Sequence, residues 1–384
     1  MNIIHTNQRR IQMKKRILAI LLSASMVFAL AACGSTSEEP AKETEATEGE
    51  STEAASGDMH FEIVSKGFQH QYWQAVLKGS EDRAKELGVT INFVGPNTES
   101  DIADQVQMFN NAINAKPAAI GLAALDTQAL LDAIQTAKDS GIPIIGFDSG
   151  VPDAPEGAVF ANCATDNYAA GELAAENMYK AIEDSVKDAT GTVRIGILSQ
   201  DATGESLVSR GLGFIDKMEE LLKADGKTVS VEGNDRFVGD SNGETVADAE
   251  VVLEVRVPAD TSSELCAIEG QTLLNKDDTI AIYASNQGSA EALVTANENI
   301  GKCGVEDGQI IAVGFDSGEV VKAAIADRIF YGAVTQAPVA MGEALVQALY
   351  DVANGQSVSD VDTGAQWYTA DNMNDPEIAQ NLYD

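Results

Sequence analysis

Short apolar runs alternate with longer amphipathic stretches along most of the chain, and this alternation predicts a parallel β-sheet covered by helices. In the first half, the apolar runs have the length of buried strands and lie at residues 61–65, 89–94, 118–123 and 143–147. The intervening stretches have the helical period, at residues 71–87, 102–115 and 127–140. A βαβαβαβ order needs crossover connections, so the strands are expected to run parallel.

The same order begins again in the second half of the chain. Strands are expected at residues 193–198, 251–257, 280–284 and 310–315, and helices at residues 206–222, 263–274 and 288–298. The predicted fold class is therefore α/β, with two Rossmann-like lobes that each contain a parallel sheet. Sheets of this kind bind ligands beyond the carboxyl ends of their strands, so candidate site residues are expected there.

The first 58 residues follow a different pattern. Three basic residues at 14–16 precede an apolar run at 17–30, which is short for a membrane span. The small residues that follow end at Cys33 and resemble a bacterial lipoprotein signal, in which the cysteine is acylated; a cleaved secretory signal is the alternative. From there to residue 58 the chain has no aromatic residue and no aliphatic one larger than alanine. We therefore expect a lipoprotein signal peptide at residues 1–32 and an acidic disordered tether at residues 33–58.

Charge and cysteine content narrow the function classes. The 384 residues include 60 Asp and Glu but only 25 Lys and Arg, and the resulting formal net charge of −35 disfavours nucleic acid as a partner. Besides Cys33, the sequence has Cys163, Cys266 and Cys303, an odd number that cannot all pair within one chain. A bridge between Cys266 and Cys303 stays open, but burial as small hydrophobic residues is favoured. The cysteines show no metal-ligand spacing, so neither a metal nor another cofactor is expected.

The segment after the first expected strand combines polar and aromatic side chains. Lys66 and His70 lead to the adjacent aromatic residues Tyr72 and Trp73, where a helix is expected to begin. Aromatic faces flanked by hydrogen-bonding groups suit a ligand with an apolar face and polar edges. The alternative is that the two rings close the top of the hydrophobic core.

The string Gly-Phe-Asp-Ser-Gly occurs at the end of the fourth expected strand and again at the end of the last one. It places Asp148 and Ser149 in the first half and Asp316 in the second, at equivalent positions. A carboxylate accepts hydrogen bonds from two vicinal hydroxyls at once, although strand-end aspartates also serve as turn formers or helix caps. Arg210 lies early in the expected helix at residues 206–222, and Asn286 follows the expected strand at residues 280–284; they add donors and an acceptor. The repetition in both halves favours a polar binding site.

At these residues the sequence resembles the periplasmic binding proteins of the ribose-binding, type I class, over about residues 60–365. The resemblance rests on an ordered set of motifs rather than on any one of them. The set consists of the pair Tyr72 and Trp73 after strand one, Asp148 after strand four, Arg210 in Arg-Gly-Leu-Gly-Phe, Asn286 in Ala-Ser-Asn, Asp316 in Val-Gly-Phe-Asp, and Gln336. In that family these positions line the sugar pocket, so the resemblance implies that they bind a ligand here.

Several positions depart from the family pattern. Ser149 stands where ribose binders have an arginine, Ala123 where they have an asparagine, and Thr261 where they have an aromatic residue. Lys66 and His70 replace smaller neutral residues. These differences argue against D-ribose itself. The candidate ligand-binding residues are Lys66, His70, Tyr72, Trp73, Asp148, Ser149, Arg210, Thr261, Asn286, Asp316 and Gln336.

The resemblance also implies two lobes that are joined by a three-segment hinge and close on the ligand. The first lobe is expected to comprise residues 59–164 and 337–365, and the second residues 165–336 and 366–384. The protein would then be lipid-anchored on the outer face of the cell membrane and hand a monosaccharide or similar polyol to an ABC permease. A monomer is expected, because no long exposed apolar run indicates an obligate interface. Residues 227–249, which are extra relative to the family, are expected to form a surface loop, and a lid is the alternative.

A signal receptor is the second hypothesis. Lys66 and the step from Asp148 to Ser149 also resemble the autoinducer-2 receptor branch of the same family. That branch keeps neither Arg210 nor Asn286, which argues against it.

An enzyme is the third hypothesis and is not favoured. His70 and Asp148 would form an acid-base pair, but no nucleophile is placed with them. The sequence also lacks the glycine motifs that bind dinucleotides or phosphates after a strand. A sugar-responsive repressor would share the fold but needs a helix-turn-helix where the leader stands.

Overall fold

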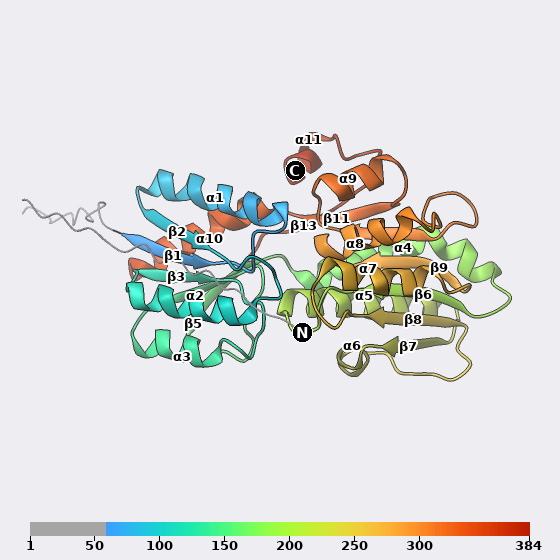
Figure 1. The fold of residues 1–384 in the computed structure, drawn as a ribbon, viewed down its shortest axis with the longest axis horizontal. Coiled ribbons are helices and arrows are strands. Elements are labelled where there is room, and N and C mark those ends of the chain that lie inside the picture. Colours follow the sequence, from blue (N-terminus) through green and yellow to red (C-terminus); the bar gives the residue numbers. More distant parts are fainter. Residues whose placement is uncertain (1–58) are drawn as a thin grey trace, which may run out of the picture. The chain divides into compact units, whose positions relative to one another are not determined.

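Two mainly parallel β-sheets form the core of residues 59–384, the part of the chain that this computed structural model describes (Figure 1). The first sheet has the strand order β12-β5-β4-β3-β1-β2. Its strands are β1 (His60–Val64), β2 (Thr90–Val94), β3 (Ala119–Leu122), β4 (Ile144–Phe147), β5 (Val159–Ala164) and β12 (Val361–Asp362). All its pairings are parallel.

The second sheet has the strand order β13-β11-β10-β9-β6-β8-β7. Its strands are β6 (Val193–Leu198), β7 (Val229–Gly233), β8 (Val251–Arg256), β9 (Thr279–Ala284), β10 (Ile311–Phe315), β11 (Gly332–Gln336) and β13 (Ala365–Tyr368). Only β13 runs antiparallel to its neighbour, β11. The expected α/β fold with two parallel sheets is therefore confirmed.

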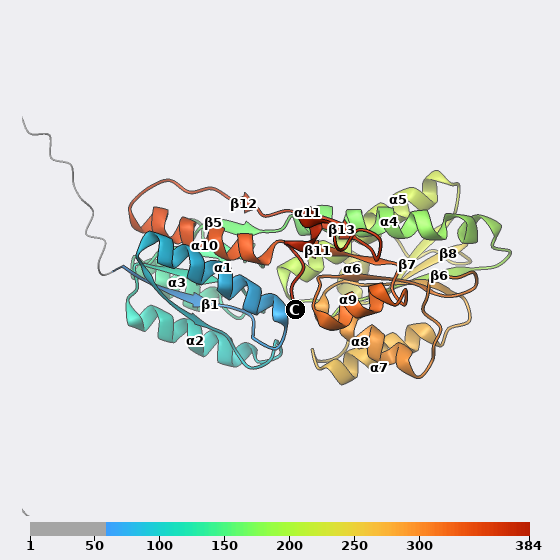
Figure 2. The same cartoon turned by 90° about the horizontal axis from the view of Figure 1, so that it is seen from above.

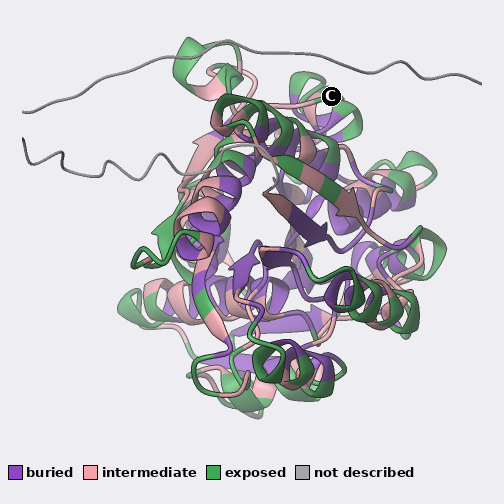
Figure 3. Cartoon of the chain, turned by 90° about the vertical axis from the view of Figure 1, so that its left-hand side faces the viewer, coloured by how far each residue is buried: buried purple, intermediate pink, exposed green. Residues whose placement is uncertain are grey.

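Helices cover both faces of each sheet. On the first sheet, α1 (Gln71–Leu87) and α10 (Pro338–Ala353) lie side by side on one face (Figure 2), and α2 (Ile102–Ala115) and α3 (Leu131–Asp139) pack on the other. The second sheet carries α4 (Asn167–Asp188) and α5 (Glu205–Ala224) on one face, and α7 (Ser263–Leu274), α8 (Gln287–Glu298) and α9 (Glu319–Ala326) on the other. The strands are largely buried and the outer helix faces are exposed (Figure 3).

The chain passes between the two sheets three times. It crosses from β5 to α4, from β11 to α10, and from β12 to β13. We call the first sheet with its helices lobe 1 and the second sheet with its helices lobe 2. Each lobe is thus assembled from separate stretches of the chain.

Most of the expected strands and helices are present, with ends that differ by a few residues. The expected surface loop at residues 227–249 is wrong, because this segment contains β7 and the short helix α6 (Asp235–Asp240). Strand β7 pairs with β8 along its whole length and buries Val229 and Val231. The segment forms a strand because of this pairing, which is a tertiary contact that the local sequence does not show.

A close contact between α4 and α5 fixes the position of Arg210. A Cβ atom on Gly171 would lie 2.1 Å from the carbonyl oxygen of Arg210, and one on Gly213 would lie 2.1 Å from that of Tyr168. Only glycine permits two helices to approach so closely at these points. As a result, Arg210 on α5 lies beside Asn167, the first residue of α4.

The three described cysteines are free and buried, so no bridge joins Cys266 and Cys303. Burial raises the pKa of Cys163, Cys266 and Cys303 to about 12, as for inert core thiols. The expected leader, tether and acylated Cys33 lie outside the described residues. Between residues 59 and 384, no helix is both long and apolar enough to cross a membrane.

Candidate functional site

The two copies of Gly-Phe-Asp-Ser-Gly adopt the same unusual backbone conformation. Asp148 follows β4 with a φ of 58°, and Asp316 follows β10 with a φ of 71°. Positive φ is uncommon outside glycine, although aspartate tolerates it better than most residues. Strained backbone conformations of this kind, which the surrounding structure has to maintain, cluster at functional sites. Each lobe therefore presents one aspartate from the carboxyl end of a central strand, as the repeated string predicted.

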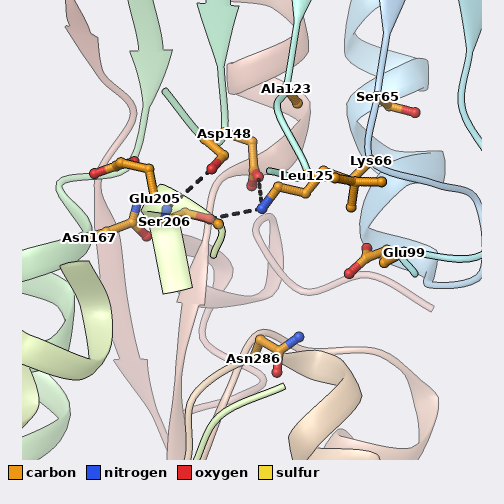
Figure 4. Close-up of polar contacts among 12 residues, drawn as sticks. Ser65, Lys66, Glu99, Ala123, Leu125, Asp148, Asn167, Glu205, Ser206 and Asn286 are labelled. Atoms are coloured by element: carbon orange, nitrogen blue, oxygen red, sulfur yellow. Dashed lines mark hydrogen bonds and ion pairs between the residues drawn. The ribbon is translucent and has the colours of Figure 1, made fainter. Parts of the chain in front are cut away.

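In lobe 1, Asp148 is held between a cation and a phenol. The Nζ atom of Lys66 lies 3.1 Å from Asp148 Oδ2 (Figure 4). The hydroxyl of Tyr72 donates to Asp148 Oδ1 at 2.8 Å. Burial alone would lower the pKa of Lys66, but Asp148, Glu99 and Asp201 outweigh it and the net pKa is raised. Burial, with Asp148 next in importance, raises the pKa of Tyr72 well above its usual value. Lys66 is therefore charged and neutralises Asp148.

Trp73 serves both the core and the site. Its ring packs edge-on against Tyr72 and Phe147, with centroid distances of 5.0 and 6.2 Å. Its Nε1 donates to Glu99 Oε1 at 2.7 Å, and Gln200 of lobe 2 donates to the other oxygen of the same carboxylate at 2.8 Å. Tyr72 and Trp73 thus close the top of the hydrophobic core, which was the alternative to a binding role. They also present polar atoms to the cleft between the lobes.

In lobe 2, Arg210 is the central cation. It is 2% exposed and stacks over the ring of Phe315, 3.6 Å from the centroid. Its Nη2 donates to Asn167 Oδ1 and its Nη1 to the carbonyl oxygen of Ser285, both at 2.7 Å. These contacts leave part of the guanidinium fork free to bond a ligand.

Asp316 accepts hydrogen bonds from two residues of its own lobe. Gln336 Nε2 donates to one carboxylate oxygen at 2.7 Å, and the backbone N–H of Gln287 donates to the other at 3.1 Å. Burial raises the pKa of Asp316, and the positive charge of Arg210 opposes that shift. Nearby, Asn286 caps helix α8 and donates to Gln200 Oε1 at 2.8 Å.

Most of the candidate residues from the sequence line one cavity between the lobes, with about 350 Å³ of space not filled by atoms. These are Lys66, His70, Tyr72, Trp73, Asp148, Arg210, Asn286, Asp316 and Gln336. Ser149 lies outside it: its hydroxyl is buried and accepts from the backbone N–H of Ser206 in lobe 2 at 3.2 Å. Thr261 also lies outside, because its loop lines a neighbouring cavity.

Several residues that line the cavity were not among the candidates from the sequence. Glu99, Ser206, Leu207 and Gln287 also line the cavity. Glu99 follows β2, so inspection of every strand end, rather than only those that match known motifs, would have pointed to this part of the chain. The polar start of α4 was missed because β5 and α4 were not predicted at all.

The acid-base pair that an enzyme hypothesis requires does not form. His70 contacts Gln69 at 2.8 Å and lies 3.9 Å from Glu291 of lobe 2, whereas Asp148 is bonded to Lys66 and Tyr72. Among residues 59–384, no group of three or more His, Cys, Asp or Glu side chains is arranged to hold a metal ion. The site is thus a set of buried hydrogen-bond donors and acceptors.

Comparisons with known proteins agree with this arrangement. The model of the periplasmic binding protein domain family matches residues 61–357. A solved structure described as an ABC transporter, LacI family transcriptional regulator from Brachyspira murdochii is 34% identical with a TM-score of 0.71, and the match covers 85% of this chain and 99% of that one. An ABC transporter solute-binding protein from Agrobacterium vitis with bound D-fucose is 28% identical with a TM-score of 0.69, over 84% of this chain and 100% of that one.

A curated relative points the same way. The ribose import binding protein RbsB of Bacillus subtilis is 24% identical over 349 residues, which cover 90% of this chain and 95% of the relative. The family match spans well over half of the sequence and includes strands β2 to β11, with the strand ends that build the cavity. The protein therefore belongs to the periplasmic binding protein domain family, as its strand-end motifs implied.

Proposed function

We propose that the protein is the extracytoplasmic substrate-binding component of an ABC importer and captures a monosaccharide or similar polyol between its lobes. The names of its relatives support this function, since they bind or import simple sugars. An acylated Cys33 would anchor the protein, and a membrane permease would receive the sugar from the monomer. Binding, rather than catalysis, is the activity.

The observation that carries the proposal is the placement of an aspartate and a neighbouring cation on each side of the same cavity. Lobe 1 contributes Asp148 with Lys66, and lobe 2 contributes Asp316 with Arg210. Carboxylates accept from vicinal hydroxyls, and cations donate to ring and hydroxyl oxygens. A neutral molecule rich in hydroxyl groups matches such a lining better than an ion would.

Contacts between the lobes indicate how the cavity excludes water. Lys66 donates to Ser206 Oγ at 3.0 Å, and the backbone N–H of Gly150 donates to Glu205 at 3.3 Å. Hinge closure would form these bonds around the ligand. A ligand that lacks one matching hydroxyl would then leave a buried group unpaired, at a cost of about 1–3 kcal/mol. Specificity would follow from that penalty.

Thermal unfolding with a panel of pentoses, hexoses, inositols and the autoinducer-2 precursor tests the proposal. One sugar at 100 times its dissociation constant is expected to stabilise the protein by about 2.7 kcal/mol. Asp148→Ala is expected to abolish this shift, whereas Asp188→Ala, an exposed aspartate at the end of α4, should preserve it. A shift with the autoinducer-2 precursor alone would favour the receptor hypothesis, and no shift with any sugar would contradict sugar binding.

Sugar affinity is expected to fall as the pH is lowered into the range where Asp316 takes up a proton. Burial raises the pKa of this carboxyl above its ordinary 3.8, and donating hydroxyls of the ligand favour the ionised form. The pKa of Asp316 is then lower in the complex than in the free protein, so binding strengthens as the pH rises through the raised value. Titration calorimetry between about pH 4 and pH 8 measures this. An unchanged pH profile in Asp316→Asn would assign the effect to another group.

A further inference from the structure

A second cavity adjoins the proposed sugar cavity, and Glu99 lines both. Counting the space at each mouth that is open to solvent, the volume not filled by atoms is about 860 Å³ in the second cavity, against about 350 Å³ in the first. Lobe 1 contributes Glu99, Ser100, Ile102 and Leu125, and lobe 2 contributes Asn234 and residues 200–203 and 257–261. Because both lobes form its walls, a ligand that fills this cavity would be held by the same closure that holds the sugar.

Two side chains connect the linings of the two cavities. Glu99 lines both, and Gln200 lines the second and bonds Asn286, which lines the first. The Glu99 carboxylate accepts from Trp73 on one oxygen and from Gln200 on the other, and Gln200 in turn accepts from Asn286. Each of these groups can exchange its present partner for a hydroxyl of a ligand without leaving a buried atom unpaired. Hydroxyls of a longer ligand can therefore replace these hydrogen bonds where the two linings meet.

The lining of the second cavity indicates the chemistry of its occupant. Apolar surface from Ile102, Leu125 and Pro258 alternates with polar side chains, a mixture that suits the C–H face and hydroxyl edges of a sugar ring. Asp201 and Asp260 each use one carboxylate oxygen for the N–H groups of their own turns. Their other oxygens accept no hydrogen bond from the described residues, so they are free to accept from hydroxyls. Together with Glu99 they would repel a phosphorylated or acidic ring.

We propose that the protein binds a neutral disaccharide, with one ring between Asp148 and Asp316 and the second ring in the cavity beyond Glu99. This inference rests on the proposed sugar-binding function and defines its ligand class. Glu99 lies at the junction, where it accepts from hydroxyls beside the glycosidic linkage. A monosaccharide between Asp148 and Asp316 would leave the second cavity without a ligand, whereas a disaccharide would occupy both cavities.

Titration calorimetry with matched sugars tests the inference. The probes are D-glucose with maltose and cellobiose, D-galactose with melibiose, and D-xylose with xylobiose. One disaccharide is expected to bind at least tenfold more tightly than its component monosaccharide. Ala259→Trp, which fills the second cavity from an exposed position, should weaken the disaccharide at least tenfold and leave the monosaccharide unchanged. Ala115→Trp, at the far end of α2, is the matched control and should alter neither.

Each other outcome overturns a distinct claim. A monosaccharide that binds as tightly as its disaccharides, with no effect of Ala259→Trp on any of them, would overturn the disaccharide and leave the proposed sugar binding in place. If no sugar of either length binds, the proposed function fails as well.

Discussion

Replacement of Arg210 by methionine is expected to abolish sugar binding and to lower the free energy of unfolding by about 3 kcal/mol. Methionine fills a similar volume but offers no donor, so Asn167 and the carbonyl group of Ser285 lose their partners. Asp316 loses the positive charge that opposes the rise of its pKa. Since truncation of one member of a buried charged set costs about 2–5 kcal/mol, the affinity should fall at least about 30-fold. Calorimetry and chemical unfolding measure the two losses.

Two further variants show whether the charge or the packing of Arg210 is responsible for the losses of affinity and stability. Arg210→Lys keeps the charge but loses the planar fork, so it should recover stability better than affinity. Asp316→Asn in the Arg210→Met background removes the uncompensated carboxylate, so the double variant should be more stable than the sum of the single losses predicts. Strict additivity would show that Arg210 and Asp316 are not coupled, and would weaken the case for a shared binding site.

The sequence predicted the elements whose local pattern is strong. Buried strands such as β3 and β4 are continuous apolar runs, and α1 and α5 have a clear helical period. Strand β7 was missed because it has only two apolar residues, Val229 and Val231. Its burial arises from pairing with β8, which is a tertiary contact rather than a local pattern.

The site was predictable where its residues repeat or match a motif, as Asp148 and Asp316 do. It was not predictable where two residues far apart in the chain become partners across the cleft. Glu99 and Gln200 are separated by 101 positions and meet only because two lobes face one another. No local pattern marks either as a partner. The second cavity, which depends on their contact, could therefore come only from the structure.

Loss of Lys66 is expected to destabilise the protein by about 3–5 kcal/mol, because Lys66→Met leaves the buried Asp148 carboxylate without its cation. The pKa of Lys66 is raised above its ordinary 10.5, so this stabilisation is complete below that value and is lost only as the pH rises through the raised pKa. Chemical unfolding at neutral pH therefore measures the whole contribution of the Lys66–Asp148 pair to the free energy of unfolding.

The double variant Lys66→Met with Asp148→Asn isolates the role of the charge. The amide keeps an acceptor for Tyr72 but carries no charge, so most of the lost stability should return. Lys78→Met, which breaks an exposed pair with Asp82 on the same lobe, should have no measurable effect. An equal loss in the single and the double variant would mean that packing of the lysine stem, rather than neutralisation of Asp148, stabilises lobe 1. Stability could instead recover in the double variant without any recovery of sugar affinity. A neutral pair would then suffice for folding but not for binding, which would show that the charges of Lys66 and Asp148 serve ligand binding.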